Sequence, residues 1–177
     1  ALKLSNQPII ALFAGRVLIA AGKPERGDAL ASELDQKLDQ ESQLFAKLLA
    51  GEAALKRGTA RPAVDNFNAA QKILDTWLGR DGLGRAYLKA DVFPDAQTEF
   101  DACLSRKGEA TTVLLDDIPT YRFLAITRYY QAVAQEGQGS KAAAADSYKE
   151  FLTIKGKGDE QGLVADARRR LALLTSH

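Results

Sequence analysis

Apolar residues along the chain recur at steps of three and four, the spacing of one face of an α-helix. An alternation of apolar and polar residues, as in a half-buried strand, does not extend over any useful length. Glycine, aspartate and proline interrupt the helical pattern at regular intervals. The pattern predicts an all-α protein made of consecutive helices joined by short turns.

The interruptions belong to a repeat of about 33 residues. From Gly84, offsets of 3, 7, 12, 16 and 19 lead to Tyr87, Asp91, Ala96, Phe100 and Cys103. From Gly51 the same offsets lead to Ala54, Gly58, Ala63, Phe67 and Ala70. Weaker copies start at Gly15 and Ala132. A period of this length indicates a solenoid whose units bury their apolar faces against one another.

Each unit is expected to form two antiparallel helices, with a small residue at the first position where the helices approach closely. The turns are expected at Gly22, Gly58, Asp91 and Gly139, because glycine and aspartate leave the helical conformation most easily. Prolines follow near the start of the second helix, at Pro24, Pro62 and Pro94. We predict a single domain, 1–177, with hairpins at about 8–40, 43–75, 77–107 and 122–155, an insertion at 107–121 and an amphipathic capping helix at 162–175.

The segment from Arg80 to Tyr87, followed by Ala96 and Phe100, resembles the tetratricopeptide repeat, with Arg80 where that family has tryptophan. The resemblance covers about residues 8–155. It implies a right-handed superhelix of helical hairpins, whose first helices line a concave groove that binds protein segments.

Three stretches, 74–80, 83–88 and 114–121, are similar to the C-terminal repeat arrays of large bacterial signalling proteins. In those proteins the array is joined to a serine/threonine kinase or to a winged-helix regulator. The resemblance implies a sensing or scaffolding module. The sequence itself has no glycine-rich phosphate loop and no kinase catalytic loop.

By this resemblance, one set of residues is expected to face the groove and a partner. The set is Arg16, Glu52, Lys56, Arg85, Lys89, Tyr121, Arg122 and Tyr129. Arginine and tyrosine are frequent at binding hot spots, and an extended peptide with acidic groups would complement these charges. The alternative is that these are ordinary solvated or packed side chains. Glu52 and Arg85 stand where the family's carboxylate clamp has asparagine, which argues against binding of a C-terminal tail.

Composition and charge reduce the number of function classes that fit the chain. The 177 residues carry 24 Lys and Arg against 23 Asp and Glu, a net charge of +1, which gives no argument for nucleic acid or for an anionic membrane. No apolar run is long enough to span a bilayer. The single cysteine, Cys103, is expected to be a buried packing residue, and the single histidine is terminal. Arg168 to Arg170 are expected to form a solvated face.

No nucleophile–base pair can be assembled from these residues, so we expect a non-catalytic protein-interaction module without a cofactor or a metal site. Two other functions stay open: self-association as a dimer, and binding of a small apolar ligand under the insertion at 107–121. Methionine is absent, so we expect the chain to be processed or to be cut from a longer protein. The sequence does not decide between a cytoplasmic and a periplasmic location.

Overall fold

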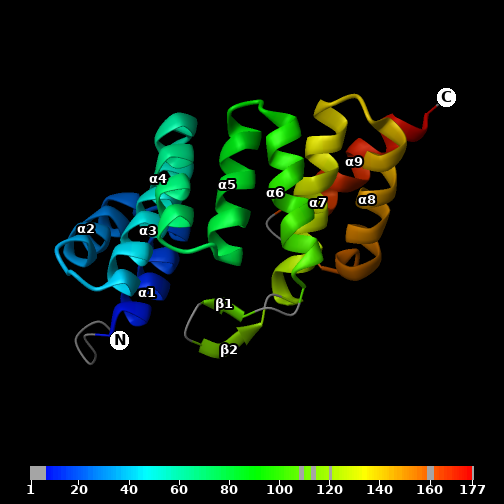
Figure 1. Cartoon of the computed structure of the whole chain (residues 1–177). Helices are drawn as coiled ribbons and strands as arrows, with labels where there is room; N and C mark the ends of the chain where they lie inside the picture. Colours follow the sequence, from blue (N-terminus) through cyan, green and yellow to red (C-terminus); the bar gives the residue numbers. More distant parts are fainter. Residues whose placement is uncertain (1–6, 108–109, 113–114, 120, 159–161, 177) are drawn as a thin grey trace. The chain divides into compact units, whose positions relative to one another are not determined.

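The computed structural model describes residues 7–107, 110–112, 115–119, 121–158 and 162–176, and most of these residues are helical (Figure 1). The helices are α1 (Pro8–Ala20), α2 (Pro24–Asp35), α3 (Gln40–Arg57), α4 (Ala60–Ile73), α5 (Trp77–Lys89), α6 (Phe93–Ser105), α7 (Tyr121–Gly137), α8 (Lys141–Lys155) and α9 (Leu163–Thr175). The predicted class, an all-α protein of helical hairpins, is confirmed.

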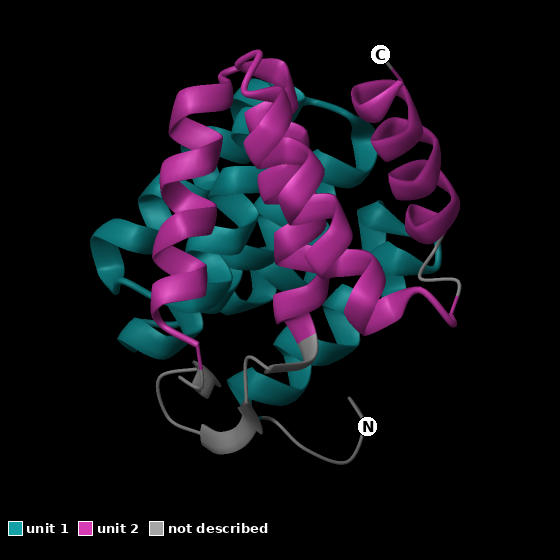
Figure 2. Cartoon of the chain, turned by 90° about the vertical axis from the view of Figure 1, so that its right-hand side faces the viewer, with its two compact units in different colours: residues 1–90 teal, residues 91–177 magenta. Residues whose placement is uncertain are grey.

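The chain divides into two compact units, residues 1–90 and 91–177, which Figure 2 colours separately. The first unit holds α1 to α5, and the second holds α6 to α9. The third predicted hairpin, 77–107, therefore contributes α5 to unit 1 and α6 to unit 2. The two units are described one at a time below.

The turns inside the hairpins fall where the repeat predicts them. Gly22, Gly58 and Gly139 have φ between 76° and 79°, and Asp91 has a φ of 58°. These values lie in the left-handed region, which ends a helix and which glycine adopts at the least cost. Gly58, for example, follows the last residue of α3 and donates its backbone N–H to the carbonyl oxygen of Leu55 over 2.9 Å.

Unit 1 packs around Phe67 of α4, which is fully buried. A Cβ atom at Gly51 of α3 would lie 2.7 Å from its ring, and one at Gly82 of α5 would lie 2.3 Å away. Glycine is therefore required on both helices that contact Phe67. Gly15 differs from the prediction: a Cβ atom there would meet Leu49 of α3 at 2.6 Å, so it allows contact between the first helices of two hairpins.

Unit 2 packs around aromatic residues of α7 and α8. Tyr148 and Phe151 are fully buried, and Val164 and Ala167 of α9 belong to the same apolar cluster. The segment predicted as a capping helix thus forms α9 and buries its apolar face against this core. Cys103 of α6 is also fully buried, as expected for a packing residue.

The predicted insertion at 107–121 contains two short strands, although the sequence pattern predicts none. β1 (Ala110–Thr112) and β2 (Leu115–Pro119) pair antiparallel, with Ala110 opposite Pro119 and Thr112 opposite Leu115. Segments of three and five residues are too short for a period-two pattern to be recognised in sequence. Residues 108–109, 113–114 and 120 of the insertion lie outside the described residues.

Candidate interaction surface

The first helices of the first three hairpins are α1, α3 and α5, and all three belong to unit 1. Their packing brings several predicted groove residues together. α1 contacts α3, and α3 contacts α5. Arg16, Glu52 and Arg85 each follow the packing glycine of their helix, so the stacking of the helices places them side by side on one surface. We call this surface the first-helix face; it comprises Arg16, Glu52, Lys56, Asp81, Arg85 and Lys89.

Glu52 is the centre of a polar network on this face. Arg85 donates two hydrogen bonds to its carboxylate, from Nη2 to Oε1 at 2.7 Å and from Nη1 to Oε2 at 3.1 Å. Arg16 approaches from α1, with Nη2 3.8 Å from Oε1. Arg85 also donates through Nε to Asp81 over 2.9 Å. A bidentate arginine–carboxylate pair fixes both side chains more firmly than a single contact does.

Burial raises the pKa of Glu52 and of Asp81, whereas the positive charges of the neighbouring arginines lower it. Burial alone would raise the pKa of Glu52, but the charges of Arg85 and Arg16 outweigh it and bring this pKa to about 2. Burial raises the pKa of Asp81, and the charge of Arg85 offsets only part of that effect. Glu52 is therefore the carboxylate whose charge the network stabilises. The two arginines and two carboxylates balance in charge.

Lys56 and Lys89 lie one helical turn beyond Glu52 and Arg85 and are exposed. Lys56 Nζ lies 3.4 Å from the carbonyl oxygen of Ala20, at the end of α1. The side chain of Lys89 lies near the end of α3, with Nζ 3.8 Å from the position that a Cβ atom would take on Gly58. Neither lysine forms an ion pair with a carboxylate within the described part of the chain. The two ammonium groups therefore add positive charge to an otherwise balanced face.

A small pocket lies beside the network. Leu12, Leu48, Phe67 and Leu78 line it together with Arg16 and Glu52, and it has room for about 10 Å³. This is the space of roughly one water molecule, so the pocket is too small for an organic ligand. This pocket therefore does not serve as a binding site for an organic ligand.

The expectation for Tyr129 is corrected. Its side chain is only 7% exposed, and its ring lies 5.9 Å from Tyr148 and 5.5 Å from Phe151, centroid to centroid. Its hydroxyl donates to Asp166 of α9 over 2.7 Å. Tyr129 thus belongs to the core of unit 2, because α8 and α9 cover the side of α7 on which it lies. Tyr121 and Arg122 begin α7, and their side chains lie outside the described residues.

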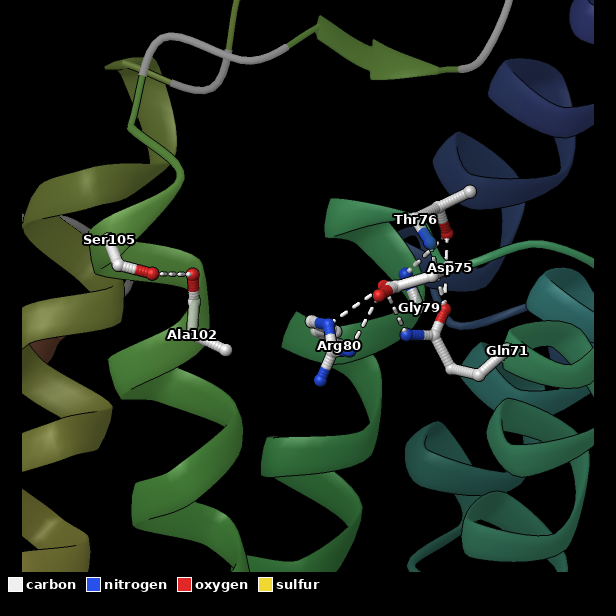
Figure 3. A network of polar contacts seen from close by, with 7 residues as sticks. All are labelled: Gln71, Asp75, Thr76, Gly79, Arg80, Ala102 and Ser105. Carbon is white, nitrogen blue, oxygen red and sulfur yellow. Dashed lines mark hydrogen bonds and ion pairs between the residues drawn. The ribbon is translucent and has the colours of Figure 1, made fainter.

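The sequence analysis did not predict two sets of polar contacts, those of Asp81 and those of Asp75. Asp81 could have been found, because it precedes Arg85 by four residues on one helix, the spacing of a helical ion pair. The other group joins α4 to α5 (Figure 3): Arg80 donates two hydrogen bonds to Asp75, at 2.7 and 2.6 Å, and Gln71 donates to Asp75 over 3.1 Å. Arg80 and Asp75 therefore fix the turn between α4 and α5.

In the basic run near the C-terminus, Arg168 and Arg169 are exposed, as predicted, whereas Arg170 is partly buried. Arg170 donates to Asp166 over 2.6 Å and to Glu136 over 3.0 Å, and Arg168 donates to the carbonyl oxygen of Gly156 over 2.6 Å. These contacts attach α9 to α7 and to the end of α8. The expectation of a solvated face therefore holds for Arg168 and for Arg169, whose side chain is 61% exposed.

The described residues also bear on two other kinds of site, a metal site and a membrane-spanning helix. Among the described residues, no group of three or more His, Cys, Asp or Glu side chains is arranged to hold a metal ion. None of the described helices has both the length and the apolar character needed to cross a membrane.

The fold is an all-α array of helical hairpins, and in unit 1 the first helices of the hairpins stack on one another. Among solved structures, one described as "MamA RS-1 ArsTM double mutant" matches with a TM-score of 0.64 and 12% sequence identity, over 96% of this chain and 95% of that one. At this identity the likeness concerns the fold alone. No protein-family model matches the chain. No curated protein matches it either.

Proposed function

We propose that this chain is a non-catalytic interaction scaffold that binds an acidic segment of a partner protein on the first-helix face of unit 1. The observation that carries the proposal is the pair of exposed lysines, Lys56 and Lys89, at equivalent positions of two adjacent helices. The preorganised helices lose little entropy on binding, and the uncompensated positive charge favours an acidic partner.

In this proposal the polar network around Glu52 has a structural role and does not contact the partner. Arg85 is held by Glu52 and Asp81, so its charge is already compensated. We infer that Arg16, Glu52 and Arg85 fix the stacking of α1, α3 and α5, and that Lys56 and Lys89 make the partner contacts. Alanine at Arg85 would therefore disturb stability as well as binding, because it would leave two carboxylates without their shared partner.

Charge reversal of the lysines tests the proposal. Lys56→Glu and Lys89→Glu are compared with Lys72→Glu, since Lys72 is also exposed and also lies in the last turn of a helix. Partners captured from the source organism by the wild-type chain are quantified by mass spectrometry. We expect the same partner to be retained by the Lys72 variant and to bind each of the other two roughly tenfold more weakly. Equal capture by all three variants would refute the proposal.

The biological setting is a further part of the proposal. The similarity of 74–80, 83–88 and 114–121 to repeat arrays of bacterial signalling proteins supports a role as the interaction module of such a protein. The sequence of the complete gene tests this: a kinase or winged-helix domain on the same chain is the expected result, and its absence would contradict it. Self-association remains the second candidate, and sedimentation velocity at micromolar concentration distinguishes a dimer from a monomer.

A further inference from the structure

Lys56 and Lys89 occupy the same place on two neighbouring helices of unit 1. Each stands five residues after the glycine at which its repeat begins, Gly51 on α3 and Gly84 on α5. α3 contacts α5, and α4 runs back between them in the chain, so the two first helices point in the same direction. The two lysines therefore lie on a line that crosses both helices. We call this pair, Lys56 and Lys89, the lysine row.

The spacing of the helices sets the distance between the two positive charges. Helices in direct contact have axes about 8–10 Å apart. Lys56 Nζ lies 3.4 Å from the carbonyl oxygen of Ala20, at the end of α1, and Lys89 Nζ lies beside Gly58, which follows α3. Both side chains thus lean toward the preceding first helix. Because they lean in the same direction, their ammonium groups keep the spacing of the helices, about 10 Å.

The charge of this line is confined to α3 and α5 within the described part of unit 1. On α1 the equivalent residue is Ala20, which is exposed and has no charge. One turn earlier on α3, the carboxylate of Glu52 is paired with Arg85 and does not offset the lysines. Lys56 has two N–H donors besides the one that it gives to Ala20. Each lysine can therefore bind one carboxylate.

We propose that the lysine row binds two acidic side chains three residues apart, in a partner segment that crosses α3 and α5 in the polyproline II conformation. The inference rests on the function proposed above and specifies the segment that binds. A polyproline II chain has three residues per turn and rises about 3.1 Å per residue. Side chains three residues apart therefore lie on the same side and about 9 Å apart, which matches the separation of the lysines.

Two other conformations of the segment fit this face less well. A β-strand needs an edge with free backbone groups, whereas α3 and α5 use theirs inside the helices. An α-helix matches the spacing with residues seven apart, but it is about 10–12 Å wide. It would also cover Arg16, Glu52 and Arg85, which lie one turn away and are partly exposed, and would remove water from their charges.

The probe is a library of random peptides of about 12 residues, displayed on phage, which is long enough for every spacing considered. It is selected on the immobilised full chain at low ionic strength, where exposed ion pairs are strongest. The same selection is made on the double variant Lys56→Gln/Lys89→Gln. Lys72→Gln is the matched control, because Lys72 is an exposed lysine in the last turn of α4. Sequencing counts acidic pairs at each separation, relative to the unselected library.

The wild-type chain and the Lys72 variant are expected to enrich acidic pairs three residues apart about two- to fivefold over pairs two or four apart. Proline should be favoured between the two acidic residues, since it adopts this conformation readily. The double variant should lose the enrichment. Lys56→Glu should select one acidic and one basic residue, still three apart, because the helices set the spacing and only one charge has changed sign. Circular dichroism should show the same helix content in every chain.

The possible results separate this inference from the proposed function. Acidic enrichment that needs both lysines but shows no preference for a separation of three would overturn the inference alone. A preference for a separation of seven would also overturn it, because the segment would then bind as an α-helix. Acidic enrichment no greater than that of the double variant would overturn both the inference and the binding of an acidic partner at the lysines.

Discussion

Glu52 has the most unusual environment of any carboxylate on the first-helix face. It is 17% exposed, accepts two hydrogen bonds from Arg85 and faces Arg16. Its pKa in the folded chain, about 2, lies below its ordinary value of 4.5. A carboxyl group whose pKa falls on folding stabilises the fold above its unfolded pKa and loses that contribution as the pH falls toward the folded value.

The pH dependence of stability tests this assignment. The free energy of unfolding of the wild-type chain should fall by about 2 kcal/mol more than that of Glu52→Gln between pH 5 and pH 2.5, because only the wild type loses the Glu52 charge. Urea denaturation at several pH values measures both curves. The exposed Glu33 provides the control, and Glu33→Gln should follow the wild type. Parallel curves for the wild type and Glu52→Gln would contradict the account.

At pH 7, Glu52→Gln should be less stable than the wild type by about 2 kcal/mol. The reason is that Arg85 and Arg16, whose side chains are 19% and 22% exposed, would lose their charged partner. Thermal unfolding measures the difference. An unchanged midpoint would mean that the three charges contribute nothing to the stacking of α1, α3 and α5.

At the scale of elements, glycine decides how closely helices pack. Gly82→Ala should destabilise unit 1 by about 1–3 kcal/mol, because the added methyl group would lie 2.3 Å from the ring of Phe67. Gly158→Ala is the control, since a Cβ atom at Gly158 would lie 3.7 Å from the carbonyl oxygen of Lys155, an ordinary van der Waals distance. Combining Gly82→Ala with Phe67→Leu should recover part of the loss of the two single variants. Denaturant unfolding measures all four chains.

The capping helix depends on one aspartate. Asp166 of α9 accepts hydrogen bonds from Tyr129 of α7 and from Arg170 of its own helix, and these partners outweigh burial and hold its pKa at about 2. Asp166→Asn should therefore loosen α9, and hydrogen exchange should speed up in α9 by about tenfold while α3 is unaffected. Uniform acceleration in both helices would contradict this local role.

The sequence predicted the helices and their turns well and the environment of side chains less well. The turn positions Gly22, Gly58, Asp91 and Gly139 all have positive φ, because a left-handed residue is a local requirement that the residue type reveals. Tyr129 was misplaced, because its exposure depends on α8 and α9, which lie later in the chain. The strands β1 and β2 were missed, since short pairing leaves little periodicity.

At the scale of the whole molecule, residues at equivalent positions of successive repeats lie side by side and form one surface. Arg16, Glu52 and Arg85 occupy the same place in three helices and meet in one network, and Lys56 and Lys89 repeat on the next turn. Comparison of equivalent positions also shows a difference at α1: Val17 is exposed, whereas the equivalent alanines of the other first helices are buried. In the function that we propose, the partner contacts a surface formed by several helices rather than a single loop.

Hydrogen–deuterium exchange of the chain alone and with its captured partner tests the central claim most directly, because it locates the contact without assuming which residues make it. The account predicts that the partner slows exchange in the last turns of α3 and α5, around Lys56 and Lys89, and that the Lys56→Glu variant loses this effect. Protection confined to α8 and α9, with α3 and α5 unchanged, would contradict it.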